Sequence, residues 1–194
     1  MTANPPTAVE PGDAELLRRY RAGDAASFTQ LYERHRLGLF RFLLGLCGDH
    51  AVAEEVFQDT WMSLIRSESL QREAAVLFKT WLYQIARNRL IDHWRKHGIR
   101  NPLHDSYDEQ LHALSDEAAD PAQLLSLSRD NQRLEAALQN LPADQREVFL
   151  LRAHGELDLP QIAALTETPL ETVKSRLRYA QQKLRRLLAE EVLT

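Results

Sequence analysis

One segment near the C-terminus carries side chains that could bind nucleic acid. Glu171, Thr172, Lys174 and Ser175 fall within two turns of a predicted helix, and these residue types hydrogen-bond to bases or phosphates. One side of this helix is basic and polar: Lys174, Ser175, Arg178, Gln181 and Arg185. The other side is apolar, with helical spacing: Val173, Leu177, Ala180, Leu184 and Leu187. An apolar inner face and a polar outer face predict a packed helix that presents charge to a partner.

The residues before this helix predict how it is held. Asp158 and Gln161 have the spacing of a capping box with Pro160 in the first turn, which predicts a short helix from Gln161 to Leu165. A second capping box, Thr168-Pro-Leu-Glu171, starts the basic helix. This order predicts a helix-turn-helix whose second helix enters the DNA major groove. The alternative is an ordinary helical hairpin with a basic surface.

The rest of the chain also has helical periodicity. Apolar residues recur at intervals of three and four from Phe28 to Leu46, where Gly48 ends the pattern, and again over residues 51–66 and 78–96. No convincing period of two, which would indicate strands, is found. The sequence therefore predicts an all-α protein made of two small helical domains, residues 13–98 and 130–194.

Residues 99–129 interrupt the periodicity and contain Pro102, Pro121 and an acidic run. They are interpreted as a flexible acidic linker, with a packed helix of the first domain as the alternative. Residues 1–12 are expected to form a disordered arm.

Charge is unevenly distributed along a chain of ordinary composition. The 194 residues include 24 Lys and Arg against 28 Asp and Glu, a net charge of -4. Basic residues nevertheless concentrate from Arg87 to Arg100 and from Thr172 to Arg186, which favours nucleic acid as a partner. The composition excludes a wholly disordered chain. A single cysteine, Cys47, excludes an internal disulfide and is expected to be a buried small hydrophobe. With no signal peptide and no membrane insertion expected, the predicted location is the cytoplasm.

Catalysis and metal binding find little support. His93 and His97 lie four residues apart, but Arg95 and Lys96 would repel a cation and no cysteine lies near them in sequence. There is no glycine-rich phosphate loop and no nucleophile elbow. We expect no enzyme activity, no metal, no cofactor and no small-molecule substrate.

Two sets of segments resemble one protein family. The C-terminal set is Gln145 to Arg152, Leu157 to Ala163 and Thr172-Val-Lys-Ser-Arg176, and it resembles the last domain of bacterial extracytoplasmic-function sigma factors. The N-terminal set is Ala53 to Trp61 and Phe78 to Asn88, and it is similar to the first domain of the same family. Both occur in the family's order.

The resemblance implies a subunit that binds core RNA polymerase, directs it to promoter DNA and helps to melt it. The matching polymerase-binding face in this chain is Glu55, Gln58, Asp59 and Met62. From the residues alone, Glu55 and Asp59 would be interpreted as solvated surface. The resemblance also implies an anti-sigma factor that holds the two domains together and masks the polymerase-binding faces.

In the minus-ten region, Asn88 matches a family position that contacts an unstacked base, and an amide can hydrogen-bond such a base edge. Arg87, Asp92, Arg95 and Lys96 accompany it, and the basic members would hold phosphates of the same strand. Trp81 is expected to be buried, and Trp94 is left open. Residues 69–77 depart from the family by lacking an aromatic and a glycine, so minus-ten specificity is not transferred to this loop.

In the minus-thirty-five region, the resemblance implies seven DNA-binding residues: Glu171, Thr172, Lys174, Ser175, Arg176, Arg178 and Tyr179. Glu167 replaces a usual turn glycine, Glu171 a small residue and Tyr179 a frequent arginine. The binding mode is therefore expected to follow the family, but the sequence preference is not. Two other classes stay open: a one-component repressor, which would not copurify with core polymerase, and a helical adaptor, which would not bind DNA.

Overall fold

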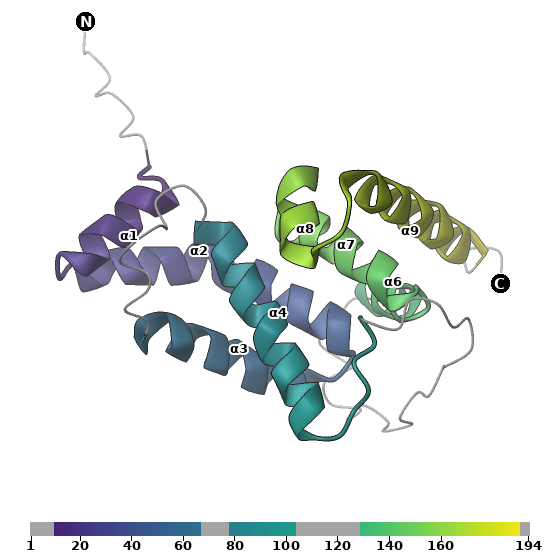
Figure 1. Ribbon diagram of the computed structural model, residues 1–194, viewed down its shortest axis with the longest axis horizontal. Helices are drawn as coiled ribbons and strands as arrows, with labels where there is room; N and C mark the ends of the chain where they lie inside the picture. Colours follow the sequence, from purple (N-terminus) through teal and green to yellow (C-terminus); the bar gives the residue numbers. More distant parts are fainter. Residues whose placement is uncertain (1–9, 67–77, 104–128, 191–194) are drawn as a thin grey trace, which may run out of the picture.

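The computed structural model describes residues 10–66, 78–103 and 129–190, and its regular structure within those ranges is entirely helical (Figure 1). An N-terminal unit contains four helices: α1 (Asp13–Arg21), α2 (Ala25–Cys47), α3 (His50–Arg66) and α4 (Phe78–Lys96). A C-terminal unit contains α6 (Arg129–Gln139), α7 (Ala143–Ala153), α8 (Leu159–Thr166) and α9 (Leu170–Glu190). The predicted all-α class with two helical parts is confirmed. The predictions for the arm up to residue 9, for the loop 69–77 and for residues 104–128 of the linker lie outside the described residues.

Helix α2 is the axis of the N-terminal unit. The Asp24 carboxylate accepts a hydrogen bond from the Ala26 amide at 3.0 Å and so caps its start, three residues before the predicted one. Gly48 ends it in a left-handed conformation (φ +70°), which glycine adopts without strain. The core of the unit comes from α2, α3 and α4: Leu31, Leu39, Phe42, Leu43, Val56, Trp61, Leu64, Leu82 and Leu90.

Helix α1 is held by contacts distant in sequence. It has nine residues, of which Leu16 and Leu17 are buried. Asp13 accepts a hydrogen bond from Arg34 Nη1 at 2.6 Å and lies 2.7 Å from His35 Nε2, both on α2. Helices this short are marginal alone, so these pairs and the buried leucines position α1.

The C-terminal unit contains the predicted helix-turn-helix. The capping box between Asp158 and Gln161 is confirmed, because each side chain binds the other's backbone amide at 2.8 Å. The turn places Glu167 in a left-handed conformation (φ 52°, ψ 39°). The second capping box takes a different form: Thr168 Oγ1 donates to the Thr166 carbonyl at 3.0 Å, and the helix begins at Leu170.

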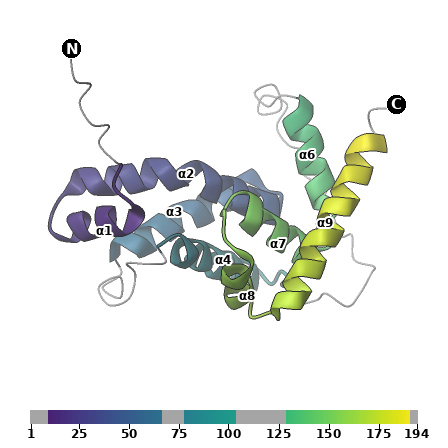
Figure 2. The same cartoon turned by 90° about the horizontal axis from the view of Figure 1, so that it is seen from above.

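The two units pack against each other. The view from above shows α7 and α8 beside α2 and α4, whereas α6 and α9 extend away from them (Figure 2). Gln139 Nε2 on α6 donates to the Gly45 carbonyl on α2 at 3.0 Å, and Tyr83 on α4 donates to the His154 carbonyl at 2.7 Å. Tyr83 is buried, so this hydrogen bond satisfies a hydroxyl that would otherwise be costly.

Candidate nucleic-acid interface

The predicted polymerase-binding face lies on α3. Glu55, Gln58, Asp59 and Met62 are all exposed along one side of this helix, while its opposite side enters the core. Met62 is 43% exposed, which is high for a large apolar side chain. Glu55 Oε1 also lies 3.7 Å from His93 Nδ1 on α4. The structure therefore brings these four residues to one accessible surface.

Helix α4 presents most of the predicted minus-ten group to solvent. Asn88, Asp92, Arg95 and Lys96 are exposed, and Arg95 forms an ion pair with Asp92 one turn before it. The Asn88 side chain is accessible, as contact with an unstacked base requires. An exposed ion pair is weak, so Arg95 can exchange its partner for a phosphate at little cost.

Arg87 differs from these neighbours because it contacts the C-terminal unit. Its Nε donates to Glu147 Oε1 on α7 at 2.7 Å; Arg87 is 17% exposed and Glu147 only 3%. Burial raises the pKa of the Glu147 carboxyl, and the charge and hydrogen bond of Arg87 oppose that rise. Arg87 is therefore not available to DNA in this arrangement.

Glu147 is not among the site residues predicted from the sequence. It lies 60 residues from Arg87 in the chain, so no local spacing connects them. The feature of the sequence that could have identified Glu147 is its place as an acid on the inward side of α7, between the buried residues Arg146 and Val148. A buried acid in such a place requires a cationic partner.

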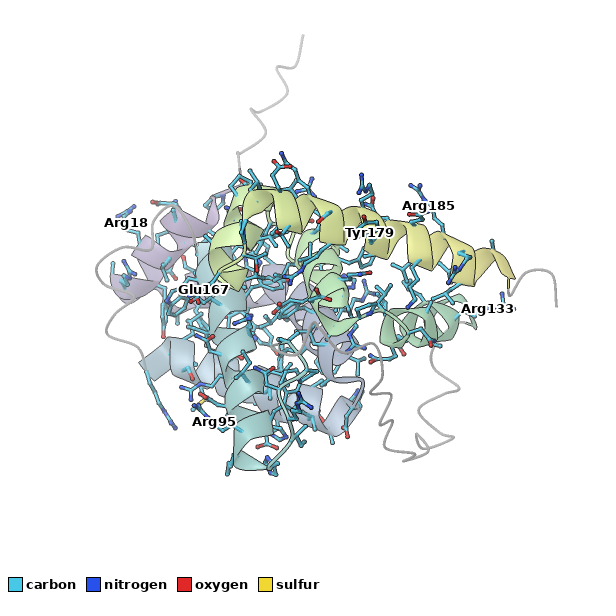
Figure 3. All side chains as sticks on the ribbon, turned by 45° about the vertical axis from the view of Figure 1, so that its right-hand side comes forward. Arg18, Arg95, Arg133, Glu167, Tyr179 and Arg185 are labelled. Carbon is cyan, nitrogen blue, oxygen red and sulfur yellow. The ribbon has the colours of Figure 1, made fainter. Side chains whose placement is uncertain are left out.

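The predicted minus-thirty-five group lies on the first turns of α9. Lys174 pairs with Glu171 at 2.7 Å, and Ser175 Oγ donates to the Thr172 carbonyl at 2.9 Å. Lys174 and Glu171 are exposed, whereas Thr172 and Ser175 are half-buried. Figure 3 shows Tyr179 and Arg185 along α9 at the top of the view, with Arg95 near the lower end of α4.

The three remaining members of this group occupy two environments. Arg178 and Tyr179 are exposed, with the guanidinium 5.0 Å from the centre of the tyrosine ring. Arg176 is half-buried; its Nε lies 2.9 Å from Asp144 on α7, and its Nη1 donates to Thr168 Oγ1 at 3.2 Å. These contacts fix α9 on α7 and on the turn.

Three expectations about other residues have mixed outcomes. Trp81, expected to be buried, is half-buried, and its ring centre lies 6.5 Å from that of Phe78 at the start of α4. Trp94, left open, is buried. Cys47, expected to be buried, is half-buried and donates its Sγ–H to the Asp49 carbonyl at 3.2 Å.

The His93 and His97 rings stack with centres 4.2 Å apart. Within residues 10–66, 78–103 and 129–190, no cluster of three or more His, Cys, Asp or Glu side chains is arranged to hold a metal ion. Over the same ranges, no helix has the length and apolar character needed to cross a membrane.

Comparison with known proteins gives matches to both units. The family described as Sigma-70 region 2 matches residues 31–99, and Sigma-70, region 4 matches residues 131–184. The chain is 32% identical to the ECF RNA polymerase sigma factor RpoE of Cereibacter sphaeroides over 84% of this chain and 86% of that protein. It is 31% identical to the ECF RNA polymerase sigma factor SigL of Mycobacterium tuberculosis over 87% of this chain and 93% of that protein.

A solved structure of similar fold is the sigma factor RpoE in complex with the anti-sigma factor NepR from Bartonella quintana. It has a TM-score of 0.63 and 31% identity, covering 84% of this chain and 96% of that one. A second is CnrH in complex with the cytosolic domain of CnrY, with a TM-score of 0.60 and 24% identity over 92% and 97% of the two chains. At that identity, the second shows likeness of fold alone.

Proposed function

The chain belongs to the extracytoplasmic-function sigma factors of the sigma-70 family, and from that premise we propose which of its surfaces bind polymerase and promoter. The observation that carries the proposal is the pair of family matches, region 2 on α2–α4 and region 4 on α6–α9, in the family's order. The protein binds core RNA polymerase and directs transcription initiation from specific promoters. It acts as a non-catalytic subunit in the cytoplasm.

The face of Glu55, Gln58, Asp59 and Met62 is the proposed polymerase-binding surface. Its support is the coexistence of two acids and an exposed methionine on a single helix side. Exposed apolar area next to charge is common in surfaces that bind proteins. The loop 69–77 that follows α3 is outside the described residues, and no specificity is assigned to it.

Asn88, Asp92, Arg95 and Lys96 form the proposed minus-ten surface, with Arg87 joining them only when its pair with Glu147 is broken. In this proposal, Asn88 hydrogen-bonds an unstacked base, and the cations hold the phosphates on either side. Support comes from the exposure of the four residues along α4.

On α9, Glu171, Thr172, Lys174 and Ser175 are proposed to reach base edges and nearby phosphates of the minus-thirty-five element. Arg178 and Tyr179 extend this surface by one turn, and Arg176 positions α9 through Asp144. The N-terminal end of the second helix of such a motif approaches the major groove, which is where the first four residues lie.

The proposed regulator is an anti-sigma factor. Support comes from the NepR complex, because a sigma factor of similar fold and 31% identity binds such a protein.

Run-off transcription with core polymerase on candidate promoters tests the proposal. Addition of this chain should produce a discrete transcript that core polymerase alone does not produce. Asp59→Arg should reduce polymerase binding and the transcript together, while helical content by circular dichroism stays unchanged. Arg36→Glu, on an exposed part of α2, is a matched surface-charge control. Normal copurification of the Asp59→Arg protein with core polymerase would exclude the α3 face.

A further inference from the structure

Arg176 on α9 is surrounded by protein groups that occupy its guanidinium. Its Nε lies 2.9 Å from Asp144 Oδ2 on α7, and its Nη1 donates to Thr168 Oγ1, in the turn before α9, at 3.2 Å. The Arg176 and Asp144 side chains are only 21% and 14% exposed. One guanidinium thus connects three pieces of the chain: the start of α7, the turn and α9. We call Asp144, Thr168 and Arg176 the α9 clamp.

The Asp144 carboxylate is held in place by its own helix. Its other oxygen, Oδ1, accepts a hydrogen bond from the Gln145 amide at 2.8 Å, in the first turn of α7. A negative charge at this end of a helix is favourable, because the unpaired amides there carry positive charge. One carboxylate oxygen is therefore engaged by α7 and the other by α9, so the position of α7 determines where Arg176 can bind.

Thr168 completes the α9 clamp from the turn. Its hydroxyl donates to the Thr166 carbonyl at 3.0 Å and accepts from Arg176. A hydroxyl has one hydrogen to donate and also accepts, so the two contacts have complementary directions. Helix α8, which ends at Thr166, is thereby linked to α9 through the Thr168 hydroxyl.

Apolar packing alone does not fix the rotation of α9 about its axis. Helix α9 packs on its unit through Val173, Ala180 and Leu184, which are buried, and such apolar contacts have no preferred direction. Arg176 lies beside this stripe, and its ion pair and hydrogen bond are directional. A rotation of about 15° would move a side-chain atom at a radius of about 6 Å by roughly 1.5 Å. A shift of that size breaks a hydrogen bond to a base edge.

The same environment makes Arg176 a poor ligand for DNA. Burial raises the pKa of Glu147 on α7, and the charges of neighbouring arginines, Arg176 among them, oppose that rise. A phosphate that took the Arg176 guanidinium would leave the largely buried Asp144 without its cation, and an unpaired buried charge is costly. Lys174 and Arg178, by contrast, are exposed. The charge of Arg176 is therefore used inside the protein.

We propose that Asp144 and Thr168 are positioning residues for recognition of the minus-thirty-five element, and that Arg176 acts with them rather than by touching DNA. This inference rests on the proposed function of α9, and it assigns sequence preference to residues outside the surface that contacts DNA. The α9 clamp sets the orientation of the base-reading side chains in the first turns of α9. Its loss reduces discrimination between DNA sequences, but not the charge that α9 presents to phosphates.

The experiment measures binding by holoenzyme to two promoters over a range of salt concentrations. One is a promoter that gives a run-off transcript, and the other has its minus-thirty-five element substituted. Asp144→Asn keeps the shape of the side chain but removes the charge that Arg176 binds. It should reduce the preference for the natural element about tenfold, while the slope of log affinity against log salt stays unchanged. Asp144→Glu, which restores a carboxylate, should recover most of the preference.

Arg176→Lys separates the α9 clamp from a phosphate contact. Lysine keeps the positive charge but lacks the planar fork that binds two partners at once. A phosphate ligand would tolerate this change, whereas loss of the α9 clamp should reduce the preference as much as Asp144→Asn does. The double variant should lose no more than either single variant, because the two residues act as one pair. Thr168→Val, which removes only the hydroxyl, should lose part of the preference.

Two control variants accompany these measurements. Glu156→Gln removes the same charge at an exposed position, where the partner is Lys79 on α4, and it should change neither the preference nor the slope. Lys174→Ala, on the exposed side of α9, should lower the slope by roughly one unit. Circular dichroism at the assay temperature establishes that each variant is folded. If Asp144→Asn is not folded, Arg176→Lys and Thr168→Val decide the result.

Unchanged preference in Asp144→Asn and in Arg176→Lys, with the expected effect of Lys174→Ala, would overturn the inference. An Arg176→Ala variant whose salt slope falls by roughly one unit would also overturn it, because it would show a phosphate contact. A different failure concerns the natural holoenzyme. If it does not distinguish the two promoters and Lys174→Ala leaves the slope unchanged, the proposed function of α9 is itself contradicted, and the inference with it.

Discussion

Arg178 lies on the exposed side of α9, beyond the first turns that reach base edges, and its guanidinium rests over the Tyr179 ring. We interpret it as a phosphate ligand. Arg178→Ala should weaken promoter binding by holoenzyme about equally on matched and mutated minus-thirty-five sequences. It should also reduce the slope of log affinity against log salt by roughly one unit. Titration with salt on both sequences measures this.

A base-reading role for Arg178 would give a different result. Bidentate contact with a guanine is worth about 1–3 kcal/mol of discrimination. A variant that loses discrimination at one base pair while keeping its salt slope would contradict the phosphate assignment.

Asn88 is exposed on α4 and is proposed to contact a base that is accessible only after unstacking. Asn88→Ala should therefore reduce open-complex formation more than initial binding to duplex promoter DNA. Permanganate footprinting measures the first, and filter binding before melting measures the second. An equal loss in the two assays would remove the assignment. Gln84→Ala, at an exposed position one turn earlier, serves as the control.

At the scale of the element, the turn of the helix-turn-helix holds a residue poorly suited to its backbone. Glu167 is exposed with φ 52°, a conformation that costs a non-glycine residue about 1–2 kcal/mol. Glycine avoids this cost but loses more conformational freedom on folding. Glu167→Gly should therefore raise the free energy of unfolding by about 0.5–1 kcal/mol in urea titration. Glu167→Ala, which keeps the Cβ, should not; equal stabilisation by both would exclude backbone strain as the cause.

The docking of α1 predicts a pH dependence. Burial raises the pKa of Asp13, but the hydrogen bonds and charges of His35 and Arg34 lower it by more, so the pKa lies below its ordinary value of 3.8. A lowered pKa in the folded state means that the charged carboxylate stabilises the fold. That contribution is complete above 3.8 and disappears as pH falls through the lowered pKa.

The measurement is the difference in free energy of unfolding between the natural protein and Asp13→Asn as a function of pH. The natural protein should be the more stable near neutral pH, and the difference should shrink below pH 3.8. A difference that stays constant down to the most acidic point would show that charge at Asp13 does not hold α1.

Sequence periodicity predicts the long helices well, and for a physical reason. Helices such as α2 and α9 bury a continuous apolar stripe, so their pattern is visible locally. Helix α1 escapes prediction because its nine residues bury few apolar groups, and it depends on Arg34 and His35 of another helix. The second capping box is predicted but not formed as such, because Thr168 binds the Thr166 carbonyl and Arg176.

The candidate site shows the same division. The exposure of Glu55, Asp59 and Asn88 follows from their place opposite an apolar stripe. The pairing of Arg87 with Glu147 could not be predicted in this way, because it joins two units and the spacing of apolar residues does not indicate how the units pack. The sequence offers one indication of this packing, which is the presence of Gly38 and Gly45 inside a helix. Glycine is unfavourable there, and the close approach of the C-terminal unit explains it.

At the scale of the whole molecule, the ion pairs between the N-terminal and C-terminal units differ in exposure. Lys79 and Glu156 form an exposed pair that salt screens, whereas Arg87 and Glu147 are largely buried. The radius of gyration of the free chain by small-angle X-ray scattering should therefore be unchanged between about 0.1 and about 1 M salt. Glu156→Gln should give the same value. Expansion at high salt would show that exposed charge, rather than the buried pair and the glycines, holds the units together.

The absence of a side chain at Gly38 also bears on evolution and protein engineering. The His154 carbonyl occupies the space that any Cβ there would need, and a backbone atom cannot be replaced by choosing another residue. The two halves are thus not freely interchangeable modules. Consider a hybrid that joins this N-terminal half to the C-terminal half of a relative. It keeps the close packing at Gly38 only if the relative's loop after α7 follows the same path as the loop at His154. Exchange of the C-terminal half between relatives is therefore coupled to whether its loop still fits against Gly38.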